Sequence, residues 1–120
     1  IIDELAPQAR DHIVVKRRDS SFQDTELDLW LRSIRADTVI FTGVDTAICV
    51  ENTLTDAFNI GYDVILVEDA TASSWYKIGQ ATIRKVAGSY GLVIETDRLV
   101  EMLHTSRSGR GTFRFYTDNL

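Results

Sequence analysis

The chain alternates short apolar runs with longer amphipathic segments, and this alternation leaves few folds open to it. Four short runs are rich in β-branched and other apolar residues, as buried strands are. They lie at residues 12–15, 38–42, 64–67 and 91–94. Apolar residues at three- and four-residue spacing then predict helices. These lie at residues 26–34, 49–60, 75–89 and 97–103. The order predicts an α/β fold, a parallel sheet with helices on both faces.

Composition bounds the class of protein. The chain has 120 residues, of which 44% are hydrophobic and 26% charged, which is ordinary for one globular domain. Its net charge of -5, without a block of Lys and Arg, argues against nucleic acid or an anionic membrane as a partner. No apolar run is long enough to span a bilayer, and nothing resembles a signal peptide. A single cysteine forms no internal disulfide, so we expect a reducing, cytoplasmic location.

The last part of the chain differs in character from the rest. Residues 1–103 are expected to form a single domain, and residues 104–120 a tail rich in Ser, Gly, Arg and Thr. The weak alternation around the aromatic residues of this tail fits an edge strand, a partner-docking arm or a disordered segment. The sequence leaves these three alternatives open.

The only cysteine, Cys49, stands between the strand at 38–42 and the helical pattern that Gly61 ends. The first N–H groups of a helix are unpaired and its dipole is positive there, so a thiolate is favoured at this position. Cys49 is therefore a candidate nucleophile. A buried cysteine that acts as a small hydrophobe is the alternative, and position alone does not separate the two.

Lys16 follows the strand at 12–15 directly, which places its amine at the carboxyl edge, where parallel sheets bind ligands. Arg17 and Arg18 fit a solvated turn instead. The sequence contains no CxxC, HExxH or P-loop motif and only two histidines, so a metal site or a Ser-His-Asp triad is poorly supplied.

Two features follow the third apolar run. Asp69 is expected to bind backbone N–H groups of its own turn, as aspartates after strands often do. Trp75 and Tyr76 either line a pocket or belong to the core at the start of a helix.

Several blocks together resemble the isochorismatase-like cysteine hydrolases, a superfamily that includes nicotinamidase, N-carbamoylsarcosine amidase, ureidoacrylate amidohydrolase and isochorismatase. The resemblance runs from about Asp11 to Leu103 and is specific because the lysine and cysteine blocks occur together. The blocks are Val14-Val15-Lys16, Ser21-Phe22, Gly43-Val44, Cys49-Val50, Thr53, Asp56-Ala57, Gly61-Tyr62 and Asp69-Ala70.

The resemblance implies a three-layer α/β/α fold with a parallel, Rossmann-like sheet of six strands and a Cys-Lys-Asp triad. Cys49 matches the nucleophile and Lys16 the lysine. A cis peptide is implied between Val44 and Asp45, with the backbone N–H groups of Asp45 and Cys49 forming the oxyanion hole. Phe22, Val44 and Asp45 are the substrate-binding candidates.

The activity implied by the resemblance is cleavage of the C–N bond of a small amide through a thioester. A catalytically silent assembly or binding subunit and a vinyl-ether-cleaving isochorismatase are the alternatives. Relatives commonly form homo-oligomers, which is the expected state here. The visible residues require no cofactor; the family's metal ligands, when present, lie mostly upstream of this sequence, so a divalent metal stays open.

The expected triad aspartate has no match in the sequence. In the family it lies on the first strand, in a segment that would precede Ile1. Asp3 and Asp11 do not follow an apolar run, so neither is assigned the role. The N-terminal strands are expected to be lacking too, which suggests the C-terminal part of a longer protein.

Two further positions depart from the family pattern. Asp45 stands where relatives have a small or hydroxylic residue, and its charge opposes an oxyanion unless it turns away or binds a cationic substrate group. Gly79-Gln80 stands where many relatives have a histidine, which we interpret as variation in substrate range.

Overall fold

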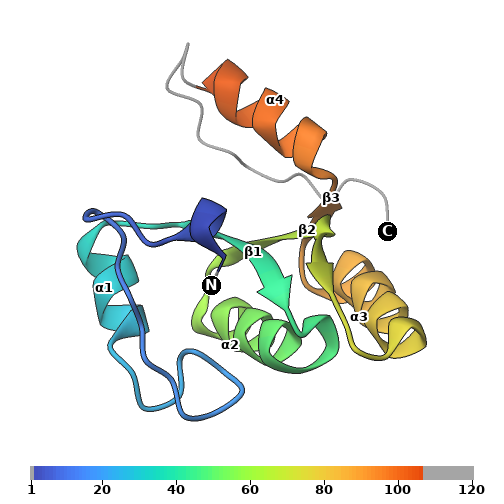
Figure 1. Cartoon of the computed structure of the whole chain (residues 1–120), viewed down its shortest axis with the longest axis horizontal. Coiled ribbons are helices and arrows are strands. Elements are labelled where there is room, and N and C mark those ends of the chain that lie inside the picture. Colours follow the sequence, from blue (N-terminus) through green and yellow to red (C-terminus); the bar gives the residue numbers. More distant parts are fainter. Residues whose placement is uncertain (1, 107–120) are drawn as a thin grey trace.

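The structure is a computed structural model that describes residues 2–106, and it shows a parallel sheet between helices (Figure 1). Its strands are β1 (Thr38–Val44), β2 (Asp63–Ala72) and β3 (Leu92–Ile94), in the order β1-β2-β3. The α-helices are α1 (Leu27–Ser33), α2 (Glu51–Ile60), α3 (Tyr76–Ser89) and α4 (Thr96–Ser106). Two short helical segments, η1 (Asp3–Leu5) and the π-helix η2 (Thr46–Val50), complete the set.

The middle strand β2 is buried on both faces, and this creates the layers. Val64 and Leu66 point into one core cluster, and Ile65 and Val67 point into another. The first cluster contains residues of α1, α2 and α3, namely Leu31, Leu54, Ala57 and Val86. The second contains Ile94 of β3 and Leu99 of α4. In Figure 1, α2 and α3 accordingly lie on one side of the sheet and α4 on the other.

Three of the four predicted strands and all four predicted helices are present. The predicted helix at 49–60 divides into η2 and α2, and it ends at Gly61 as predicted, in a left-handed conformation with φ 113°. Strand β2 is longer than its apolar run because it continues through polar residues to Ala72. Helix α4 continues to Ser106, past the predicted start of the tail at residue 104; residues 107–120 lie outside the described part of the chain.

The strand predicted at residues 12–15 is wrong, because the segment has no strand structure. A strand needs a neighbour that completes its hydrogen bonds, and within residues 2–106 β1 pairs with β2 alone. The segment contacts α1 instead: the His12 ring stacks on Trp30 with centroids 4.7 Å apart. Ile13 and Val15 stay 63% and 67% exposed.

The register between β1 and β2 changes near their carboxyl ends. Phe41 pairs with Leu66, but Gly43, two residues on, pairs with Thr71, five residues on. The extra residues in β2 form an irregularity of the kind that re-aims side chains at the end of a sheet. As a result, Thr71 and the loop after it lie beside the end of β1.

The core assignment predicts the effect of shortening a buried leucine. Leu54→Ala should lower the free energy of unfolding by about 2 to 5 kcal/mol, because Leu54 is 0% exposed and its loss leaves a cavity. Leu29→Ala is the matched control: Leu29 lies on α1 and is 74% exposed, so the same change should stay within about 0.5 kcal/mol. Urea unfolding followed by circular dichroism measures both. Equal losses would contradict the placement of Leu54.

Candidate active site

Cys49 lies in the turn that joins β1 to α2. Strand β1 ends at Val44, the peptide bond between Val44 and Asp45 is cis at the position that the resemblance implies, and η2 follows. Cys49 is the fourth residue of η2, half-buried and free of a disulfide. Because η2 runs directly into α2, the thiol stands at the carboxyl end of β1 and in the first helical turns beyond it.

The loop that contains Lys16 lies against this turn. The Lys16 ammonium donates hydrogen bonds to the backbone oxygens of Arg18, at 2.9 Å, and Asp19, at 3.0 Å, and so closes its own loop. Asp19 Oδ1 lies 3.9 Å from Cys49 Sγ. The structure therefore brings the predicted lysine and cysteine segments together through Asp19, a residue that the sequence did not single out.

Thr53 fixes the next part of this loop to the helix of the nucleophile. Its hydroxyl donates to the backbone oxygen of Cys49 at 2.7 Å and accepts from the Ser21 N–H at 3.0 Å. Thr53 is buried, one helical turn after Cys49. A loop 32 residues away in the sequence is thereby held on the nucleophile helix.

The remaining substrate-binding candidates differ in exposure. The Phe22 ring is half-buried, packs against the core and stacks on Tyr62 with centroids 6.1 Å apart. Val44 is 73% exposed at the end of β1. Their substrate-binding roles stay predictions.

The Asp45 carboxylate is turned into the loop after β2. Its Oδ1 accepts from the Ala47 N–H at 3.0 Å and the Ser73 hydroxyl at 2.7 Å, and its Oδ2 accepts from the Ser74 N–H at 2.8 Å. The hydrogen bond from Ser73, followed by that from Ser74, lowers the pKa of Asp45 to about 2. From the sequence, a charge is tolerated here if the side chain turns away or binds a cationic substrate group. In the structure, the carboxylate binds hydrogen-bond donors of the protein itself.

A chain of hydroxyls runs beside this carboxylate. Thr71 donates to the backbone oxygen of Gly43 at 2.8 Å, so the Thr46 hydroxyl, 2.8 Å from that of Thr71, is the donor of the pair. Thr46 is 1% exposed. The register change in β2 is what places Thr71 within reach of both, and the chain ties the first residue of η2 to the sheet.

Glu51 connects the start of α2 to α3. It accepts hydrogen bonds from Lys85 Nζ and from the Thr82 hydroxyl, each at 2.6 Å. Burial raises the pKa of Glu51, but the bonds from Lys85 and Thr82 and the ammonium charge outweigh it, so the net shift is downward. Two residues from Cys49, this pair holds the nucleophile helix against its neighbour.

Asp69 binds its own backbone N–H, as predicted for a local contact, and in addition the start of a distant helix. Its Oδ1 accepts from the backbone N–H and the hydroxyl of Thr96, at 2.8 and 2.9 Å. These bonds lower the pKa of Asp69 and fix the start of α4 to β2. The partner lies 27 residues on, so no local pattern indicates it.

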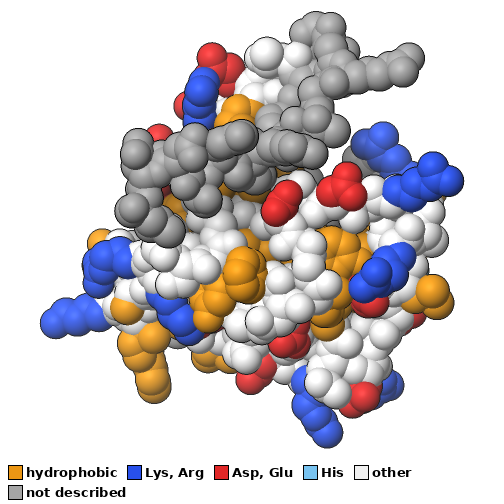
Figure 2. All heavy atoms as spheres, turned by 180° about the vertical axis from the view of Figure 1, so that it is seen from behind, with side chains coloured by type: hydrophobic (Ala, Val, Ile, Leu, Met, Phe, Trp, Pro, Cys, Tyr) orange, Lys and Arg blue, Asp and Glu red, His pale blue; other side chains and the backbone are white. Residues whose placement is uncertain are grey.

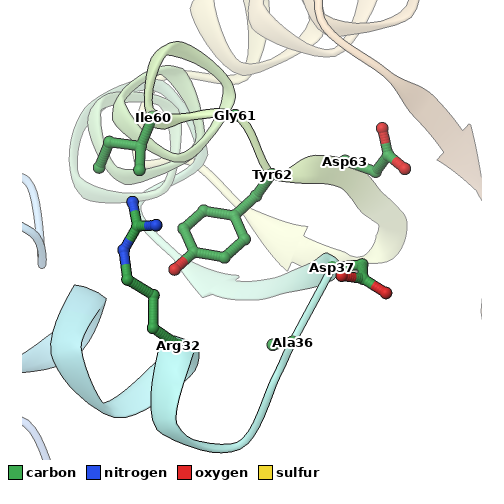
Figure 3. Close-up of a pocket in the computed structure, with 7 residues that line it drawn as sticks. All are labelled: Arg32, Ala36, Asp37, Ile60, Gly61, Tyr62 and Asp63. Carbon is green, nitrogen blue, oxygen red and sulfur yellow. The ribbon is translucent and has the colours of Figure 1, made fainter.

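A cavity of about 290 Å³ lies away from Cys49, beside the amino ends of β1 and β2 (Figure 3). In Figure 3 the Arg32 guanidinium and the Tyr62 ring lie together, while the carboxylates of Asp37 and Asp63 point away from them. Arg32 and Tyr62 are both bonded to Asp28, at 2.9 and 2.8 Å. The polar groups of this cavity thus serve the fold, and the candidate chemistry stays at the opposite ends of the strands.

Residues 2–106 contain no group of three or more His, Cys, Asp or Glu side chains that is placed to hold a metal ion. None of the helices within that range has the length and apolar character needed to cross a membrane.

Known proteins are similar to this chain over most of its length. A family model described as an isochorismatase domain matches residues 1–98. The chain is 38% identical over 104 residues to the ureidoacrylate amidohydrolase RutB of Serratia proteamaculans, a match that covers 86% of this chain and 42% of that protein. The chain therefore spans less than half the length of this relative.

Solved structures give the same result. A cysteine hydrolase from Pseudomonas syringae pv. phaseolicola superposes with a TM-score of 0.85 at 31% identity, over 88% of this chain and 55% of that one. Nicotinamidase PncA from Bacillus subtilis superposes with a TM-score of 0.66 at 31% identity, over 67% and 45% of the two chains. The layers described above are thus those of a larger, known fold.

The Asp45 hydrogen bonds predict how stability depends on pH. The carboxyl pKa falls from 3.8 to about 2 on folding, so the stabilisation is fully present above about pH 4 and is lost as pH falls towards 2. The stability advantage over Asp45→Asn, from urea unfolding at several pH values, should therefore shrink across this window. In Ser73→Ala, which lacks the strongest donor, the same dependence should be shallower. An advantage that is constant with pH would contradict the prediction.

Proposed function

Because this chain belongs to the isochorismatase family, we propose that the protein hydrolyses the C–N bond of a small-molecule amide with Cys49 as its nucleophile. The observation that carries the proposal is the position of Cys49, in the turn after β1 with the Lys16 loop beside it. The similarity to an amidohydrolase and a nicotinamidase supports an amide as the substrate. The present chain spans only part of these relatives, so the activity belongs to the whole protein.

The proposed reaction has two stages. The Cys49 thiolate attacks the amide carbonyl carbon, a C–S bond forms, the C–N bond breaks, and the leaving amine takes up a proton. Water then attacks the resulting thioester, which releases the carboxylic acid and returns the thiol. Each tetrahedral intermediate carries negative charge on the former carbonyl oxygen. We assign its stabilisation to the backbone N–H groups of Asp45 and Cys49.

Lys16 is proposed to stabilise the thiolate. Two of its three N–H donors are used by the carbonyls of Arg18 and Asp19, which fixes the ammonium within the loop whose Asp19 contacts Cys49. A positive charge close to a cysteine favours the thiolate form. The third N–H is then available for the sulfur or the substrate.

A carboxylate is needed to accept the thiol proton and pass it to the leaving amine. Asp19 is the carboxylate that contacts Cys49 among the described residues, at 3.9 Å. The resemblance assigns this role to an aspartate that would precede Ile1. The two assignments are distinguished by Asp19→Asn, which removes the charge with little change in size.

The silent-subunit alternative loses part of its support. It depended on the unmatched aspartate and on the charge of Asp45, and that charge is engaged by Ser73 and Ser74. The vinyl-ether alternative has no need of a thiol nucleophile. Cys49, placed as it is at the start of a helix, favours the amide reaction over both.

We also propose a cytoplasmic homo-oligomer. A single cysteine, which forms no internal disulfide, is typical of a reducing compartment. Trp75 and Tyr76, adjacent at the start of α3, are 71% and 76% exposed, and neighbouring exposed aromatic side chains fit an interface. Other hydrophobic side chains reach the surface only at separate places on the face seen in Figure 2. Sedimentation velocity of the whole protein tests self-association, and cell fractionation tests location; a monomer, or a secreted protein, would contradict the proposal.

The activity test uses the whole protein with ureidoacrylate and nicotinamide as substrates. Cys49→Ala should lower kcat by roughly 10³-fold or more, because it removes the nucleophile. Lys16→Ala should lower kcat by about 10²-fold, since the thiolate loses its countercharge. Asp19→Asn should cost about 10²- to 10⁴-fold if Asp19 carries the proton, and little if the upstream aspartate does. Unchanged turnover in Cys49→Ala, measured as loss of amide by chromatography, would rule the mechanism out.

A further inference from the structure

We propose that Asp45 is a positioning residue, whose carboxylate clamps the loop after β2 onto the turn that carries Cys49. This inference rests on the proposed function of that turn and adds a role for a side chain that is unusual at its position. The role is to set the direction of the backbone N–H groups of Asp45 and Cys49. The carboxylate itself donates no hydrogen bond to the oxyanion.

One carboxylate joins two distant segments. On its own side it accepts from the Ala47 N–H, which closes the first turn of η2 in the manner of a helix cap. On the other side it accepts from Ser73 and Ser74, which lie 28 and 29 residues away. The same group therefore shapes the nucleophile turn and attaches it to the β2–α3 loop.

Helix α3 packs closely against Ser73, one of the donors of the clamp. Gly79, in the first turns of α3, is buried, and a Cβ at this position would lie 2.7 Å from Ser73 Cβ and 3.9 Å from Thr46 Cβ. Glycine is thus needed for the close approach of α3 to Ser73. Because Thr46 is 1% exposed and bonded to Thr71, the turn has little room to shift once Ser73 is fixed.

The hydrogen bonds of the clamp also stabilise the negative charge of the Asp45 carboxylate. Three donors are aimed at the carboxylate, and they hold its pKa at about 2, so it stays ionised and bonded over the pH range of enzyme action. The carboxylate thereby stays bonded to the β2–α3 loop, while the backbone N–H of Asp45 remains part of the turn that carries Cys49. Loss of the clamp should misdirect the N–H groups more than it alters the sulfur.

The test compares two reactions of Cys49 in the whole protein. p-Nitrophenyl acetate acylates the thiolate through an oxyanion, with loss of p-nitrophenolate, whereas iodoacetamide alkylates it by displacement of iodide without an oxyanion. The ratio of the two rates therefore reports the oxyanion donors. Asp45→Ala, which removes all three bonds, should lower this ratio by about 10- to 100-fold. In Asp45→Asn, which keeps the Oδ1 acceptor, the ratio should fall less.

Two further variants keep the test decisive. Asp69→Asn is the matched control, because Asp69 also binds donors of a distant segment, but on the β3 side of β2; its ratio should equal that of the wild type. Ser73→Ala removes one donor without altering Asp45, so it carries the test if Asp45→Ala does not fold, with an expected loss of several-fold. Thermal unfolding checks that each variant is folded under assay conditions.

The outcomes separate the two proposals. A ratio that is unchanged in Asp45→Ala and Ser73→Ala, or that falls equally in Asp69→Asn, overturns the clamp, even if the protein hydrolyses amides. A selective fall in the Asp45 and Ser73 variants supports it, even if neither ureidoacrylate nor nicotinamide is turned over and the amidase proposal fails.

Discussion

The structure depends on the burial of β2 on both of its faces. The four residues 64–67 are between 0% and 4% exposed and alternate between the two core clusters. Burial of such side chains contributes about 1.5 to 3 kcal/mol each. Because both faces are filled, β2 is fixed relative to α2 on one side and α4 on the other. The carboxyl ends of the strands, where the candidate site lies, inherit this fixed frame.

Polar contacts at the carboxyl edge then connect three segments to the nucleophile turn. Thr53 holds the loop from Ser20 to Phe22, Asp45 holds the loop after β2, and Glu51 holds α3. Individual hydrogen bonds of this kind contribute about 1 kcal/mol to stability. Their larger effect is on geometry, because each one ties the turn to a different neighbour, and a turn held from three sides has few ways to move.

The sequence predicts those parts of the fold that depend on local pattern. Periodicity located α2 and its end at Gly61, and apolar runs located β1 and β3. The run at 12–15 has the same composition but becomes a strand only beside a pairing partner, which composition does not report. The distant partners, Ser73 and Ser74 for Asp45 and Thr96 for Asp69, were not predictable either, since they lie 27 to 29 residues away in the sequence. The Cys49 turn was predictable because its strand, turn and helix are contiguous.

The carboxylate of Asp45 shows why residue type alone is a poor guide to electrostatics. A negative charge close to a developing oxyanion repels it. Three donors that point at the carboxylate place their positive ends beside it and offset part of this field. A threonine or alanine at this position would avoid the repulsion, but neither offers two acceptor oxygens to reach Ala47, Ser73 and Ser74 together. The charge is tolerated here because three donors stabilise it, and we propose that the same bonds position the backbone around it.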